Sequence, residues 1–261
     1  MTGESPGSYV KAAMLHEPSS APPAIPRPEP PAPHRDTPDG GPFLVVCFGN
    51  LASHTQRACQ EFLPQLAQAG VPRISLMLMP RCPKVEPLPY FGRWVRSLAE
   101  AGHEICLHGD AGAGLADGSS QCADLGIAIA GFAPPAGPLS AAVRAELAAR
   151  GFAYTVTPDG IDLLPSGIHL DAPAVPLAAG NSWQIPGAWL RTLRTRLLCS
   201  ARRDAAVLRL DVEPAALYQP ALRHTLLTLV REALATRSPA TCGELAARAA
   251  ASSHPLSFQR A

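Results

Sequence analysis

The chain has 261 residues, of which 47% are hydrophobic and 16% are charged, and its formal net charge is +1. This length and apolar content suffice to bury the core of one large domain. The basic residues are scattered, unlike the basic patch of a nucleic-acid-binding protein, and no apolar run approaches the ~20 residues that span a bilayer, so neither nucleic acid nor a membrane is an expected partner.

The cysteines and the N-terminus indicate a compartment. The seven cysteines are widely spaced and include no CxxC pair. This pattern argues against a disulfide framework and a thiolate zinc site, and favours buried thiols in a reducing environment. The first residues have neither the basic start nor the apolar core of a secretory signal. We therefore expect a cytoplasmic protein.

Residues 1–41 are rich in proline, serine, alanine and glycine. The run 22–31 contains so many prolines that it can form neither a helix nor a central strand. We predict a disordered, partly polyproline-II tail over 1–41, a folded domain over 42–250 and a short C-terminal tail over 251–261. A docking motif for a protein partner within the N-terminal tail is the alternative.

Strands and helices alternate from residue 43 onwards. Apolar runs predict strands buried on both faces, and apolar stripes that end in glycine predict helices. The expected strands are 43–48, 73–79 and 104–107, and the expected helices are 58–69 and 88–98. This order, with short links, predicts right-handed βαβ units and a parallel sheet.

The second half of the chain continues in the same way. The expected helices are 139–147, 189–197, 222–233 and a last one that starts at a capping box formed by Thr241 and Glu244; the expected strands are 152–156, 161–164 and 205–210. We predict that 152–156 and 161–164 pair across the Pro-Asp-Gly turn between them. The fold class is α/β, a distorted and incomplete (β/α) barrel of about seven units with mostly parallel strands.

Several polar residues fall at the ends of these strands. Active sites of parallel α/β folds lie at the carboxyl ends of the strands. Asn50, Arg81 and His108 occupy such positions and should face one cleft. His103 stands before its strand and is expected to be exposed, as is His224, which lies off the apolar stripe of its helix.

Three segments carry a family resemblance. They are GHEICLHG at 102–109, GFAPPA at 131–136 followed by RGFAY at 150–154, and VLRLDVEP at 207–214. They resemble the GHEIxLHG, GFxPPAWLLS…RGFxY and LRLxLHP segments of the polysaccharide deacetylase (NodB-homology) superfamily, in its cytosolic-type branch. The resemblance covers about residues 43–248.

The resemblance implies a distorted (β/α) barrel that binds a divalent, zinc-type metal through one aspartate and two histidines. It also implies hydrolytic removal of acetyl groups from sugar amides or esters by metal-bound water, with an aspartate as base and a C-terminal histidine as acid. The expected ligand is a small carbohydrate or an acetylated metabolite.

The family's reactive groups are mostly replaced in this chain. By the resemblance, His108 matches the first metal histidine, whereas Gly112 stands at the second. Asn50 replaces the metal and base carboxylate, and Glu213 replaces the C-terminal histidine. A neutral amide adds no negative charge and cannot take a proton. We therefore expect an impaired enzyme, a pseudoenzyme, with candidate catalytic residues His108, Asn50 and Glu213 and with His108 as its one metal ligand.

Further residues are candidates for substrate binding. Arg81 and Asp110 follow predicted strands, and Pro134 and Pro135 are expected to form a rigid cleft wall.

Three alternatives remain open. His108 could be a strand-end imidazole hydrogen-bonded to backbone. The chain could instead be an active metal-dependent C–N or ester hydrolase, in which His54, Asp110, Asp211 and Glu213 rebuild a site around His108. Finally, it could be a non-catalytic module that binds a glycan or a partner.

Overall fold

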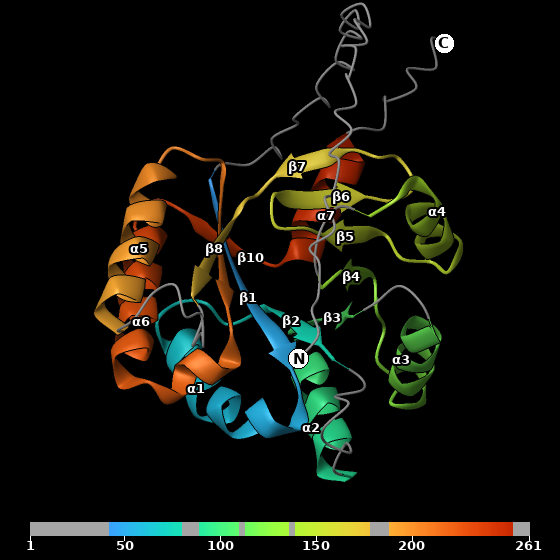
Figure 1. Cartoon of the computed structure of the whole chain (residues 1–261), viewed down its shortest axis with the longest axis horizontal. Helices are drawn as coiled ribbons and strands as arrows, with labels where there is room; N and C mark the ends of the chain where they lie inside the picture. The colour runs from blue at the N-terminus through green and yellow to red at the C-terminus, as the bar shows by residue number, and fades with distance from the viewer. Residues whose placement is uncertain (1–41, 80–88, 110–112, 136–138, 178–187, 253–261) are drawn as a thin grey trace, which may run out of the picture. The chain divides into compact units, whose positions relative to one another are not determined.

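One curled sheet organises the residues that the computed structural model describes, namely 42–79, 89–109, 113–135, 139–177 and 188–252 (Figure 1). The strands are β1 Phe43–Leu51, β2 Ser75–Leu78, β3 Glu104–His108, β4 Gly131–Ala133, β5 Tyr154–Val156, β6 Gly160–Leu163, β7 His169–Asp171, β8 Ala174–Leu177, β9 Val207–Val212 and β10 Ser238–Ala240. Within this part of the chain they form a ten-stranded sheet in the order β7-β6-β5-β4-β3-β2-β1-β9-β8, with β10 paired to β1.

The sheet is mostly parallel and does not close. The strands from β5 through β1 to β8 pair in parallel, as does β10, and only β5–β6 and β6–β7 pair antiparallel. The path ends at β7 on one side and β8 on the other. This confirms the expected α/β fold, a distorted and incomplete barrel.

Helices follow the strands along the chain. They are α1 Gln56–Gln68, α2 Pro89–Glu100, α3 Ala113–Asp124, α4 Ala141–Ala149, α5 Ala188–Ala201, α6 Pro220–Leu234 and α7 Cys242–Ser252, with short 3-10 helices η1 Ser53–Thr55 and η2 Pro214–Tyr218. None of the helices in the described ranges is both long enough and apolar enough to cross a bilayer.

Alternate residues of β1 enter two separate cores. Leu44, Val46 and Phe48 pack with the apolar residues of α1, α2 and α6, whereas Val45 and Cys47 pack with residues of α7. Because side chains alternate along a strand, a strand buried on both faces appears as a continuous apolar run in the sequence. We call the cluster that contains Leu44, Val46 and Phe48 the outer core, and the cluster that contains Val45 and Cys47 the inner core. The inner core, which α7 completes, is the layer beneath the carboxyl ends of the strands.

The strongly periodic elements lie where the sequence predicts them. Gly70 and Gly102, with φ of +101° and +87°, follow α1 and α2 as expected for glycines that end helices. The strands β5 and β6 pair antiparallel across the predicted turn. The capping box is also present, since Thr241 N donates to Glu244 Oε2 at 2.9 Å and Glu244 N donates to Thr241 Oγ1 at 3.2 Å.

Other elements were not predicted. The helix α3 begins at Ala113, soon after His108, in a stretch that contains glycines and serines. The strands β4, β7, β8 and β10 are three or four residues long, too short to show a periodicity. The predicted N-terminal tail, 1–41, lies outside the described residues, as do 253–261; the helix α7 extends to Ser252.

The expectation that His103 is exposed was wrong. Its ring is half-buried, and its Nδ1 accepts a hydrogen bond from Ile74 N at 3.3 Å. This acceptor role requires Nδ1 to be unprotonated, and burial lowers the pKa of His103 below the usual value of histidine. The exposure of His224 is confirmed.

Candidate functional site

A cavity of about 620 Å³ lies at the carboxyl ends of the strands. Its lining includes the three candidate catalytic residues, Asn50, His108 and Glu213, together with Asp211 and the predicted wall residues Pro134 and Pro135. These side chains come from β1, β3, β4 and β9 and from the turns that follow these strands. Strands distant in the sequence thus bring the candidates to one place, because the carboxyl ends of parallel strands share one edge of the sheet.

His108 is the last residue of β3 and is half-buried. Its Nδ1 lies 2.9 Å from the carbonyl oxygen of Ala133 in the neighbouring β4. Because a carbonyl can only accept, Nδ1 carries the proton, and in the neutral ring Nε2 is the acceptor nitrogen. The backbone of β4 therefore sets both the orientation of the ring and its tautomer.

Asn50 stands at an irregularity of β1. Its φ is +52°, and among the described residues it is the one non-glycine residue with a positive φ. The pairing of β1 with β2 shifts register between Phe48 and Leu51, which is typical of a β-bulge. Asparagine tolerates this left-handed conformation better than most residues. The bulge places an exposed, uncharged amide at the cavity.

Asp211, near the end of β9, and Glu213, just after it, lie on the inner face of this strand. They alternate with Val212, which packs in the outer core, so both carboxylates lie on the cavity side. Glu213 ends the extended segment, and its N–H donates to Leu177 O of β8 at 3.0 Å. The strand is regular enough to present both acidic side chains to one space.

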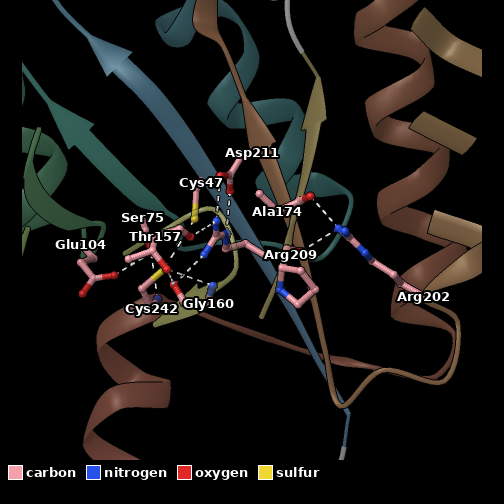
Figure 2. Close-up of polar contacts among 11 residues, drawn as sticks. Cys47, Ser75, Glu104, Thr157, Gly160, Ala174, Arg202, Arg209, Asp211 and Cys242 are labelled. Atoms are coloured by element: carbon pink, nitrogen blue, oxygen red, sulfur yellow. Dashed lines mark hydrogen bonds and ion pairs between the residues drawn. The ribbon is translucent and has the colours of Figure 1, made fainter. Parts of the chain in front are cut away.

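The Asp211 carboxylate is bound by Arg209, a residue that the sequence analysis did not single out (Figure 2). Arg209 Nε lies 2.9 Å from Asp211 Oδ1, and Nη2 lies 3.1 Å from Oδ2. The Arg209 side chain is 1% exposed and Asp211 is 35% exposed. Burial alone would lower the pKa of Arg209, but the neighbouring Asp211 carboxylate keeps it above its usual value. The available signal was an arginine at an inward position of an otherwise apolar strand.

A second polar cluster lies beneath the cavity and also appears in Figure 2. Cys47 Sγ, which lines the cavity floor, lies 3.6 Å from Cys242 Sγ, and Cys242 N donates to Ser75 Oγ at 2.9 Å. Ser75 Oγ donates to Glu104 Oε2 at 2.6 Å, and the Tyr154 hydroxyl donates to the same carboxylate.

This inner cluster is built of neutral donors around Glu104. The hydrogen bond to Cys242 and burial raise the pKa of the Cys47 thiol, so this thiol stays protonated near neutral pH. Five of the six cysteines in the described ranges are buried and all six are free thiols, as the sequence predicts. The floor of the cavity is therefore only weakly polar.

The described residues do not fit the metal site that the family resemblance implies. Within these ranges, no three histidine, cysteine, aspartate or glutamate side chains are grouped as ligands of one ion. Asn50 is neutral and the Asp211 carboxylate is already paired with Arg209. His54 is exposed on η1 and does not line the cavity. Arg81, Asp110 and Gly112 lie outside the described residues.

The sequence matches no family model and no curated protein. The similarity appears in solved structures. A protein from Mycobacterium smegmatis, provisionally assigned as a polysaccharide deacetylase, superposes with a TM-score of 0.64 and 17% identity, over 88% of this chain and 99% of that one. The fold is that of the polysaccharide deacetylases.

Two further solved structures agree with this fold. A deacetylase from Bacillus cereus gives a TM-score of 0.50 and 12% identity, over 76% of this chain and 91% of its own. A mutant of a CE4 family pseudoenzyme, described as having restored enzymatic activity, gives 0.54 and 14% identity, over 83% of this chain and 72% of its own. At these identities the likeness establishes the fold and not the activity.

Proposed function

We propose that this chain is a divergent protein of the polysaccharide deacetylase fold that binds a small acetylated carbohydrate or metabolite, and that its metal-dependent hydrolysis is impaired. The observation that carries the proposal is the composition of the strand-end cavity. Asn50, His108, Asp211 and Glu213 line this cavity. A metal site needs available anionic ligands, but the Asn50 side chain is a neutral amide and the Asp211 carboxylate is paired with Arg209.

The size and lining of the cavity support binding of a small ligand. Its volume of about 620 Å³ falls within the range of small-molecule sites. Apolar side chains, such as Met77 and Val156, form much of the lining, and the polar groups are few and convergent. The structural neighbours are named as polysaccharide deacetylases, which makes an acetylated sugar the natural first probe.

The polar groups are suited to accept hydrogen bonds. The carboxylates of Asp211 and Glu213 are acceptors, and Nε2 of the neutral His108 tautomer is also an acceptor. Hydroxyl and amide N–H groups of a sugar are the complementary donors. In the family a divalent metal would activate water and polarise the carbonyl, but the described residues do not form its ligand set, so binding is the activity that this arrangement supports.

Calorimetric titration with chitotriose in the presence of EDTA, together with an assay for released acetate, tests the proposal. We expect chitotriose to bind without metal and acetate release to stay at background. His108→Ala should weaken chitotriose binding about tenfold, because one hydrogen bond contributes ~1.4 kcal/mol or less. His224→Ala, which changes an exposed histidine of α6, is the matched control and should bind like the wild type.

The second candidate function, an active hydrolase with a rebuilt site, is favoured by the presence of His108, Asp211 and Glu213 around one cavity. It predicts acetate release that EDTA and His108→Ala both abolish. That result would overturn the proposal of impaired hydrolysis, and an absence of any affinity for acetylated sugars would overturn the proposal of binding.

A further inference from the structure

The buried arginine Arg209 connects β9 to the segment where β5 turns into β6, and these two parts of the sheet are not paired as strands. From β9 its Nη2 donates to Thr157 O at 2.7 Å, in the turn between β5 and β6, and its Nη1 donates to Gly160 O at 3.2 Å, at the first residue of β6 (Figure 2). Ala174 N, at the start of β8, donates to Pro158 O of the same turn at 2.8 Å. Individual polar contacts therefore hold this turn against β8 and β9, where the open sheet has no strand ladder.

The same guanidinium holds the Asp211 carboxylate at two points. The contacts of 2.9 Å and 3.1 Å to the two carboxylate oxygens form a fork, which fixes the plane of the carboxylate as well as its position. In the described part of the chain, Asp211 makes its side-chain hydrogen bonds to Arg209 alone. Because Arg209 is almost wholly buried and Asp211 is 35% exposed, the carboxylate is the member of the pair that faces the cavity.

Stability alone does not account for this pair. Arg209 is among the largest fully buried side chains of the described residues, and an apolar side chain of similar volume commonly packs as well as a buried ion pair or better. The guanidinium instead does two things that an apolar residue cannot: it fixes the Asp211 carboxylate, an acceptor, at the cavity wall, and it anchors the turn. Thr157 and Pro158 of this turn also line the cavity, so one side chain sets both features.

We propose that Arg209 is a positioning residue and that the Asp211 carboxylate it holds is a specificity-determining acceptor, selecting neutral ligands rich in hydroxyl or amide N–H donors. This inference rests on the proposed function of the same cavity. Each carboxylate oxygen can accept more than one hydrogen bond, so pairing with Arg209 leaves acceptor capacity for a ligand. A carboxylate only accepts hydrogen bonds, so the carboxylate of an anionic sugar offers Asp211 no donor, and Asp211 disfavours such a ligand.

Titrations of the full chain with chitotriose and with glucuronic acid test this selectivity. Asp211→Asn should weaken chitotriose binding about tenfold to a hundredfold, since a hydrogen bond to a charged group is lost, and should improve the affinity for glucuronic acid relative to chitotriose. Arg209→Lys keeps the charge but loses the fork, and should weaken chitotriose binding in the same direction. The matched control is Arg96→Lys in the exposed Arg96–Glu100 pair of α2, which should change neither affinity.

A crystal structure of Arg209→Lys, with thermal unfolding of all variants, completes the test. We expect the Asp211 carboxylate to leave its wild-type position. If the variants are folded and bind both sugars as the wild type does, the inference is overturned while the proposed function stands. If the wild type binds no sugar, the proposed function fails, and an unmoved Asp211 in Arg209→Lys overturns the positioning role. If Arg209→Lys does not fold, Asp211→Asn decides through the ratio of the two affinities.

Discussion

Arg209 is a buried charge whose hydrogen-bond partners lie far from it in the chain. The strand-end rule identified Asn50 and His108, because each follows an apolar run, and the family resemblance pointed to Glu213. Arg209 lies inside such a run, and its partners Thr157 and Gly160 are 52 and 49 residues away in the chain. A buried charge is tolerated only when hydrogen-bond partners surround it, and here the curvature of the sheet brings those partners close to Arg209. No local pattern could have identified them.

His103 gives a prediction at the scale of one proton. Burial lowers its pKa in the folded protein, so below the ordinary pKa of about 6.5 the unfolded chain takes up a proton that the folded chain resists. Stability is therefore complete above that value and declines as the pH falls from it towards the lowered pKa of the folded state. Protonation would also place a donor against the N–H of Ile74.

Urea unfolding of the wild type and His103→Leu near pH 8 and near pH 5 checks this prediction. We expect His103→Leu to lose ~1–3 kcal/mol near pH 8, because the N–H of Ile74 loses its acceptor, and to lose less on acidification than the wild type does. His224→Leu is the control for an exposed ring. Equal acid sensitivity of His103→Leu and the wild type would contradict the assignment.

At the scale of elements, the helices and long strands were predictable because burial imposes a period on the sequence. The stripe of α6 and the continuous run of β1 are each buried as their patterns require. The three-residue strands β4, β7 and β10 are defined by their neighbours in the sheet and not by their own residues. The helix α3 contains glycines and serines that favour a loop locally, so its formation depends on its place in the fold.

The start of α7 carries the prediction at this scale. Thr241 and Glu244 satisfy each other's backbone N–H groups, and the helix that they begin completes the inner core beneath the cavity. Thr241→Ala should lower the free energy of unfolding by ~1 kcal/mol, measured in urea. Thr228→Ala, whose hydroxyl donates to His224 O within α6, is the comparison and should change it by less than ~0.5 kcal/mol. A similar loss in both variants would argue that the cap is not important.

At the scale of the whole molecule, the open sheet determines which side chains line the cavity. The sheet ends at β7 and β8, and Arg209 holds the turn after β5 against β9 beside the opening. The polysaccharide deacetylase fold thus provides the space, and the side chains at its edge, Asn50, His108, Asp211 and Glu213, set the chemistry of that space. The sequence allowed the fold to be predicted, but not the arginine that binds Asp211.

Zinc content after equilibration with zinc and dialysis into metal-free buffer tests the central claim most directly. The family resemblance implies that N50D with G112H would supply the two zinc ligands that His108 lacks. We predict substoichiometric zinc in the wild type and stoichiometric zinc in the double variant, because one imidazole cannot complete the coordination of zinc. Stoichiometric zinc that the wild type retains through dialysis would contradict the account.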